Sequence, residues 1–230
     1  MNIQEYFHIS QEEIKEKKYN IIIPICLGNK FFSEKTVIND NVRRYLEWAL
    51  EHTKDKVLFV IVDKIQLTNY LIRHKNRSEK SGLKHVLTEG QKIKSNIEKL
   101  VSKSHDKKIE IIIWDEYEKQ DNFCHNTTQL VYKEFESNKE FRTAVLSAVK
   151  TSVTDRPFSN EEYLKLCNYV LDEFSIVYSG TMYEKDYYGL YIYPETDSVV
   201  YLIENIKAGR LFSTLEEKLP NVKVALAILK

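Results

Sequence analysis

The sequence predicts one α/β domain spanning residues 1–230, built on a doubly wound, mostly parallel five-stranded sheet. Its 230 residues suit one large domain. Hydrophobic residues make up 43% and charged residues 30%, with six Gly and four Pro, which is typical of a folded globular chain. Short apolar runs alternate with amphipathic stretches, as in successive βαβ units.

The predicted strands are short apolar runs, most of them rich in β-branched residues. The first, IIIPICL, is too short for a helix and is typical of a parallel strand buried on both faces. The fourth is stopped by Pro194. The five predicted strands span residues 21–27, 56–63, 108–114, 188–193 and 222–229.

Helical periodicity separates these strands. Ser33 is the expected cap of the first helix and Asn160 that of the fourth, while Pro157 favours termination of the third. The predicted helices span residues 33–50, 80–103, 130–153, 161–173 and 197–208. The alternation indicates a Rossmann-like sheet, which binds ligands where loops leave the carboxyl ends of its strands.

Several classes of protein do not fit this sequence. No apolar stretch approaches the length of a membrane span and the start is polar, so we expect a cytoplasmic protein. Cys26, Cys124 and Cys167 lie far apart and form no metal-binding motif, so neither a disulfide nor a metal is expected. The turn after the first strand has one glycine and no nucleotide-binding fingerprint, so no cofactor is expected.

Charge is unevenly distributed although the formal net charge is zero. Residues 64–108 hold twelve Lys and Arg against four Asp and Glu. Helical spacing puts Lys92, Lys99 and Lys103 on one face. This face is either a solvated surface kept for solubility or a surface that contacts nucleic-acid phosphates.

Four residues in three motifs are candidates for chemistry. Cys26 lies at the carboxyl end of the first strand, where it is either a nucleophile or a small buried hydrophobe. Tyr169 and Glu173 share a helix face and can hold an ammonium group or move a proton, although such pairs are often surface pairs. Tyr193 can bring a second phenol to the same edge, or Tyr193-Pro194 simply ends a strand.

Taken together and in this order, these motifs resemble those of the tRNA-dependent cyclodipeptide synthases. The matching segments are CLGNKFFS from Cys26, YVLDE at 169–173, Tyr193-Pro194, and EFESNKEFRTAVLSAV ahead of Asp155-Arg156-Pro157. The resemblance spans roughly residues 20–205. The family's nucleophile is a serine, which Cys26 replaces here, and Pro194 indicates its Tyr-Pro branch, although Asn29 is typical of the Tyr-His branch.

The resemblance implies a fold similar to the catalytic domain of class Ic aminoacyl-tRNA synthetases and a ping-pong aminoacyltransferase reaction without ATP. Two aminoacyl-tRNAs would yield a 2,5-diketopiperazine through an aminoacyl-enzyme at Cys26. Tyr169 and Glu173 would bind the α-ammonium, Glu173 would accept its proton, and Tyr193 would assist ring closure. The protein would act as a monomer, without membrane or metal.

The resemblance also implies binding residues. The aminoacyl group would meet the turn at Gly28 and Asn29 and an apolar pocket formed by Ile22, Pro24, Ile176 and Tyr191. The tRNA would contact Lys84, Lys92, Lys99 and Lys103, with Arg73, Lys75 and Arg77 as further candidates.

The sequence also permits two other functional hypotheses. The chain can be an aminoacyl-tRNA-binding homologue that has lost turnover, because Cys26 replaces the expected serine. It can also be a cysteine-dependent hydrolase or acyltransferase with a histidine as its base. The candidate bases are His8, His52, His74, His85, His105 and His125.

Overall fold

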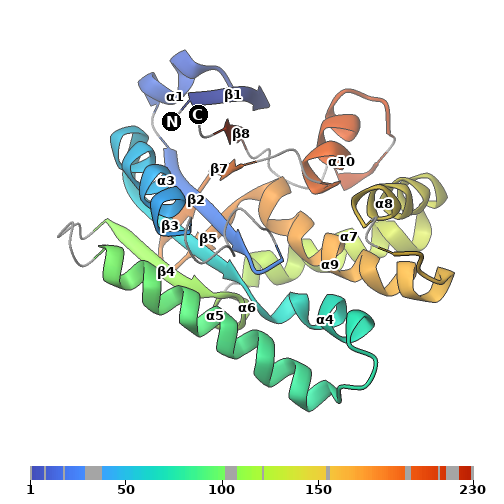
Figure 1. Cartoon of the computed structure of the whole chain (residues 1–230). Helices are drawn as coiled ribbons and strands as arrows, with labels where there is room; N and C mark the ends of the chain where they lie inside the picture. Colours follow the sequence, from blue (N-terminus) through green and yellow to red (C-terminus); the bar gives the residue numbers. More distant parts are fainter. Residues whose placement is uncertain are drawn as a thin grey trace.

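The computed structural model describes residues 2–7, 9–17, 19–28, 38–101, 108–120, 122–153, 156–194, 198–211, 213–215 and 223–228. A six-stranded sheet in the order β1-β8-β7-β2-β3-β4 forms its centre (Figure 1). The strands are β1 (Asn2–Phe7), β2 (Tyr19–Cys26), β3 (Thr53–Val62), β4 (Ile109–Ile113), β7 (Leu190–Tyr193) and β8 (Lys223–Ile228). The last five named are parallel to one another, whereas β1 runs antiparallel to β8.

The five predicted parallel strands are confirmed, with two corrections. The sequence NIQEYF was expected to be a polar N-terminal segment, but it forms the edge strand β1, whose mixed polar composition gives no apolar run. The predicted strand over 188–193 is divided at Gly189. Its first residue ends β6 (Asp186–Tyr188), which forms a small hairpin with β5 (Thr181–Tyr183).

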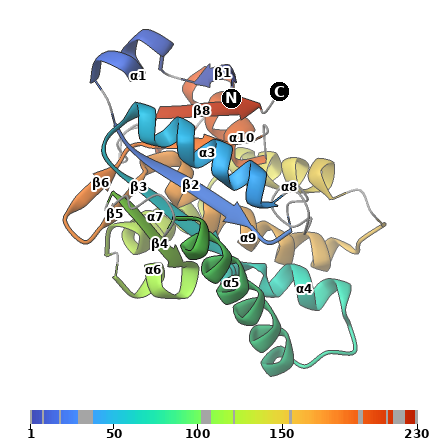
Figure 2. The ribbon, with the colours of Figure 1, turned by 60° about the vertical axis from the view of Figure 1, so that its left-hand side comes forward.

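Helices cover both faces of the sheet, as expected for a doubly wound fold (Figure 2). In that view α3 and α5 lie in front of the sheet, and α8, α9 and α10 lie behind it. The helices are α1 (Gln11–Lys17), α3 (Ile38–His52), α4 (Leu67–Arg73), α5 (Glu79–Val101), α6 (Trp114–Gln120), α7 (Asn122–Ser137), α8 (Lys139–Ser152), α9 (Asn160–Ser179) and α10 (Ser198–Lys207).

Capping residues explain where two predicted helices are wrong. The helix expected over 130–153 is broken at Asn138, whose side chain accepts hydrogen bonds from the backbone N–H groups of Glu140 and Phe141 and so starts α8. The cap of α9 is Ser159 rather than Asn160, in a reciprocal capping box with Glu162. The predicted cap Ser33 lies outside the described residues.

The core follows from the apolar strands. Residues Ile21–Ile23 and Val57–Ile61 are fully buried between the two helical layers. Parallel β2 and β3 stay in register from Ile21↔Val57 to Cys26↔Val62, so both strands end at the same edge of the sheet. That edge therefore places the residues after Ile25 and Ile61 side by side.

Candidate active site

Cys26 is the last residue of β2 and is buried, with 3% of its surface exposed. Its thiol donates a hydrogen bond to Glu173 Oε1, with 3.2 Å between sulfur and oxygen. Glu173 lies on α9 and is 4% exposed. The fold thus joins two predicted residues that are 147 positions apart in the chain.

Two phenols complete the cluster around the sulfur. The side chains of Tyr169 and Tyr193 both hydrogen-bond Cys26. Tyr169 lies one helical turn before Glu173 on α9, and Tyr193 ends β7, the strand next to β2. The four residues predicted as catalytic therefore converge at the carboxyl edge of the sheet.

The surroundings of Cys26 keep its thiol protonated. Burial raises the pKa of Cys26 well above its usual value, and the negative charge of Glu173 raises it further. Hydrogen bonds from Tyr193 and Tyr169 act in the opposite direction but do not offset the burial. Burial likewise raises the pKa of Tyr169. The cluster thus places the Cys26 thiol and two phenol groups around the side chain of Glu173.

The predicted apolar pocket residues lie on β2, β7 and α9, the elements that carry this cluster. Ile22 and Pro24 alternate with Cys26 along β2 and so share its face of the sheet. Tyr191 is the neighbour of Ile22 across the β2–β7 ladder, and its ring centroid lies 5.9 Å from that of Tyr193. Ile176, one turn beyond Glu173 on α9, is also buried.

The turn after β2 is described as far as Gly28, which is exposed, while Asn29 lies outside the described residues. A Cβ atom at Gly28 would lie 3.7 Å from the side chain of Gln66, so Gln66 borders this turn. The Gln66 oxygen accepts a hydrogen bond from Asn69 at 3.0 Å. Sequence reasoning missed Gln66, although its position four residues after the end of β3 was an available signal.

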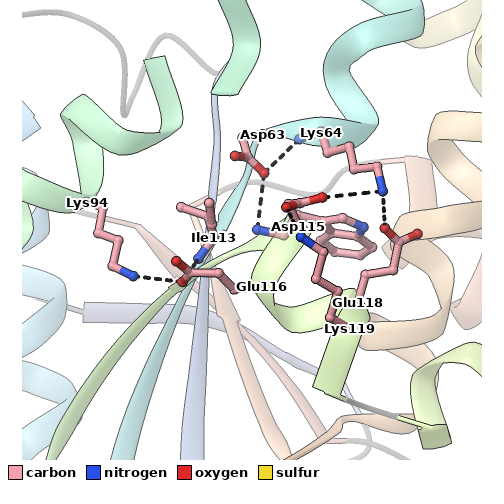
Figure 3. A network of polar contacts seen from close by, with 9 residues as sticks. Asp63, Lys64, Lys94, Ile113, Asp115, Glu116, Glu118 and Lys119 are labelled. Atoms are coloured by element: carbon pink, nitrogen blue, oxygen red, sulfur yellow. Dashed lines mark hydrogen bonds and ion pairs between the residues drawn. The ribbon is translucent and has the colours of Figure 1, made fainter. Parts of the chain in front are cut away.

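A second polar network lies at the ends of β3 and β4 (Figure 3). Asp63 Oδ1 accepts hydrogen bonds from the backbone N–H groups of Lys64 at 2.7 Å and Trp114 at 3.1 Å. Asp63 Oδ2 is buried and makes no hydrogen bond within the described part of the chain. Burial raises the pKa of Asp63 to about 6. Nothing in the sequence analysis singled out this carboxyl group.

Ion pairs surround Asp63. Lys64 Nζ lies 2.6 Å from Glu118 and 3.5 Å from Asp115, and Lys94 of α5 lies 2.7 Å from Glu116 (Figure 3). These contacts fasten α6 to the end of β3 and to α5.

The described lysines of the predicted tRNA surface are exposed on α5. Lys84, Lys92 and Lys99 all lie on the outer side of this helix, whose buried positions include Val86, Gly90 and Ile97. Lys92 pairs with Glu89 on the same helix. Lys103 lies outside the described residues.

The described histidines make their contacts elsewhere. His52 stacks on Trp48, His74 and His85 lie against the ring of Tyr70, and His125 contacts Gln129. His8 and His105 lie outside the described residues. Within the described ranges, no helix is long and apolar enough to cross a membrane.

No protein-family model matches this chain, nor does any curated protein sequence. Solved structures do match. A cyclodipeptide synthase from Bacillus thermoamylovorans superposes with a TM-score of 0.73 at 17% identity, covering 95% of this chain and 91% of that one. The chain has the fold of the cyclodipeptide synthases.

Two further structures extend this comparison. The Mycobacterium tuberculosis protein Rv2275, whose structure relates cyclodipeptide synthetases to type I tRNA synthetases, gives a TM-score of 0.71 at 15% identity, covering 95% and 89% of the two chains. A cyclodipeptide synthase from Candidatus Glomeribacter gigasporarum bound to Phe-tRNA gives 0.58 at 18% identity, covering 92% and 88%. The expected relation to the synthetase fold is thereby confirmed.

Proposed function

We propose that this protein is a cyclodipeptide synthase, an aminoacyltransferase that joins the amino acids of two aminoacyl-tRNAs into a 2,5-diketopiperazine. The observation that carries the proposal is the convergence of Cys26, Glu173, Tyr169 and Tyr193 at the carboxyl edge of a sheet with this fold. The aminoacyl ester is already activated, so a nucleophile, an ammonium site and a proton path are sufficient and ATP is not needed.

In the first half-reaction Cys26 attacks the carbonyl carbon of one aminoacyl-tRNA. A bond forms between Sγ and this carbon, and the ester bond to the ribose oxygen of the tRNA breaks. The thiol proton ends on the released ribose hydroxyl. Glu173, which already accepts the hydrogen bond of this thiol, is the nearest described group that can take up the proton during the attack.

In the second half-reaction the amine of the bound residue attacks the carbonyl carbon of the second aminoacyl-tRNA. An amide bond forms, the ester bond to the ribose oxygen of this tRNA breaks, and the released hydroxyl takes up a proton. Glu173 and Tyr169 hold this amine as an ammonium ion, and Glu173 accepts the proton that must leave before attack. The new amine of the dipeptidyl enzyme then attacks the thioester carbonyl, the bond to Cys26 breaks, and the thiol is protonated again. Tyr193, hydrogen-bonded to the sulfur, assists this last proton transfer.

The residues proposed to line the aminoacyl pocket favour an apolar first amino acid. Ile22, Pro24, Ile176 and Tyr191 are buried on the elements that carry the cluster, and their side chains consist mainly of carbon atoms. Tyr193-Pro194 supports placement in the Tyr-Pro branch of the family. We further propose a monomer that works in the cytoplasm, where its aminoacyl-tRNA substrates are made.

The test is to incubate the protein with a mixture of charged tRNAs and search by mass spectrometry for diketopiperazines and for an aminoacyl adduct on Cys26. Product together with adduct supports the synthase. Finding neither would contradict the proposal. Cys26→Ala is the matched control, because it removes the sulfur and should remove both signals.

One observation favours a second candidate, an aminoacyl-tRNA-binding homologue without turnover. The thiol is buried and protonated, so the thiolate that would attack is scarce at neutral pH. Adduct or tRNA binding without a cyclic product would support this candidate. Cys26→Ser tests it directly, because turnover gained by the serine variant would mean that the thiol limits the reaction.

The exposed lysines of α5 are proposed to contact tRNA phosphates. Reversing charge with Lys92→Glu and Lys99→Glu should weaken aminoacyl-tRNA binding at low salt, and the loss should shrink as salt rises. The matched control is Lys54→Glu with Lys185→Glu, because both residues are exposed near the amino ends of the strands, away from Cys26. Unchanged tRNA affinity in the α5 variant would remove this surface from the proposal.

A further inference from the structure

Gln66 lies beside the turn that follows Cys26. It is the last residue of η1 (Lys64–Gln66), a short 3₁₀ helix that begins directly after Asp63. A Cβ atom at Gly28 would lie 3.7 Å from Gln66 Oε1 and 4.0 Å from Gln66 Nε2, so the carboxamide faces this glycine. Gly28 is two residues beyond Cys26. The Gln66 side chain therefore lies at the same edge of the sheet as the candidate nucleophile.

The backbone of Gln66 is held in place by its neighbours. Asp63 Oδ1 accepts a hydrogen bond from the Lys64 N–H group, and the Gln66 N–H group donates to the Asp63 carbonyl oxygen at 3.0 Å. The η1 helix also packs against α9, which carries Glu173. A hydrogen-bond donor that is fixed before a reaction needs no reorganisation when negative charge develops beside it.

The Gln66 carboxamide is buried, and only its oxygen is paired within the described part of the chain. The residue is 8% exposed, and Asn69 Nδ2 donates to its Oε1 at 3.0 Å. This bond turns the oxygen toward α4, and no residue in the described ranges accepts a hydrogen bond from Gln66 Nε2. Asn69 Oδ1 is also buried without a partner in those ranges. Buried amides that serve structure alone normally have their N–H groups paired, so a structural role leaves those of Gln66 unexplained.

Gln66 and Tyr193 approach the end of β2 from opposite sides. Tyr193 ends β7 and hydrogen-bonds the Cys26 sulfur, whereas Gln66 follows β3. In the sheet, β2 lies between β7 and β3. A carbonyl group bonded to this sulfur has Glu173 on the α9 side, and a carboxylate there would repel a negative oxygen. The β3 side offers N–H donors from Gln66 instead.

We propose that Gln66 Nε2 donates a hydrogen bond to the carbonyl oxygen of the aminoacyl group that Cys26 attacks. The inference rests on the proposed function and adds a catalytic residue to it. When Sγ bonds to the carbonyl carbon, the π electrons of the C=O bond move to the oxygen, which becomes negative and is stabilised by the Gln66 N–H group. The C=O bond re-forms as the bond to the ribose oxygen breaks, and that oxygen takes the thiol proton by way of Glu173. The same oxygen becomes negative again during ring closure, because the amine then attacks the same carbon.

The test compares two reactions of the Cys26 sulfur, each followed by mass spectrometry of the adduct. Acylation by p-nitrophenyl acetate passes through a negative oxygen, whereas alkylation by iodoacetamide does not. Gln66→Met removes the N–H donor at nearly constant side-chain length, so it should lower the acylation rate by about 10²–10³ and leave the alkylation rate unchanged. The matched control is Gln129→Met on α7, whose amide contacts His125 and which should leave both rates unchanged. Thermal melting checks the fold of each variant.

Charged tRNA is the second arm of the experiment. Gln66→Met should slow formation of the aminoacyl adduct by the same factor and leave tRNA affinity unchanged. Equal losses of acylation and alkylation would overturn the proposal, because Gln66 would then act on the thiol or on the fold. Unchanged acylation would overturn it too, as would a Cys26 that accepts no acyl group from either ester. Acylation that depends on Gln66, without any diketopiperazine from charged tRNAs, would reject the proposed synthase and keep this donor.

Discussion

Strands β2 and β3 are parallel neighbours that end at the same edge of the sheet. A buried group that can carry a proton is the last residue of β2, and another directly follows β3. At β2 the group is Cys26, whose partners are side chains from α9 and β7. At β3 it is Asp63, whose Oδ1 accepts hydrogen bonds from the backbone N–H groups of Lys64 and Trp114. The two strand ends share position and burial but differ in what surrounds them.

This difference distinguishes a structural polar network at Asp63 from a candidate reactive site at Cys26. Backbone N–H groups cannot exchange protons with a ligand, so the Asp63 network fixes η1 (Lys64–Gln66) and α6 in place. The partners of Cys26 are a carboxylate and two phenols, all of which can give or accept protons. A buried titratable group surrounded by side chains from distant segments is therefore the better candidate for chemistry.

The largest expected effect is on turnover at the β2 end. Glu173→Gln keeps the shape of the side chain but removes the proton acceptor, so the rate of diketopiperazine formation should fall by about 10²–10⁴. The matched control is Asp172→Asn, the adjacent carboxyl group, which faces Tyr132 instead of Cys26. Equal losses of this rate in both variants would mean that Glu173 contributes to the structure of α9 and not specifically to catalysis.

Substitutions near the end of β3 should change the stability of the protein rather than the rate of its reaction. A Cβ atom at Gly90 would lie 2.7 Å from both Cβ and Oδ2 of Asp63, and this part of Asp63 cannot swing away. Gly90→Ala should therefore lower the free energy of unfolding by about 2 kcal/mol, despite the better helix propensity of alanine.

Gly82→Ala on the same helix is the control for this change. Its new Cβ would meet side-chain ends of Leu71 and Leu67, which can move, so the cost should be smaller. Denaturant unfolding measures both variants. A Gly90→Ala protein as stable as wild type would mean that α5 does not press against Asp63.

Asp63 should also make stability depend on pH. Burial raises its pKa from 3.8 to about 6, so the folded state holds the proton more tightly than the unfolded state. The contribution is favourable below about pH 4 and is lost as pH rises through 6. Relative to Asp63→Asn, wild type should lose about 1–2 kcal/mol of unfolding free energy between about pH 4 and 7. A difference between the two proteins that stays constant with pH would contradict this.

The smallest expected effect concerns the other face of α9. Tyr132 donates to Asp172 Oδ1 at 3.0 Å, and burial raises the pKa of Asp172 to about 6. Tyr132→Phe should cost about 1 kcal/mol of unfolding free energy, because Asp172 loses this donor. Tyr201→Phe, at a tyrosine that is 59% exposed, should cost nothing measurable.

The sequence predicted much of this molecule because its signals were local. Runs such as IIIPICL identify buried parallel strands without knowledge of their neighbours, and five of the six sheet strands were predicted this way. The edge strand β1 was missed because an antiparallel edge pairs through backbone groups and needs no apolar run. The break at Asn138 was missed because the apolar pattern continues across a cap that only side-chain geometry reveals.

For the candidate site, too, the sequence predicted the local features and the tertiary structure decided the contacts between distant segments. The sequence by itself determined the residue types of Cys26, Tyr169, Glu173 and Tyr193, their places at a strand end or on one helix face, and a resemblance carried by their order. Only the tertiary structure decided that Glu173 reaches the Cys26 sulfur at 3.2 Å, that the thiol is buried and protonated, and that Gln66 borders the turn at Gly28. Periodicity acts over a few residues, whereas hydrogen bonds, burial and charge act between whichever segments the packed sheet brings together.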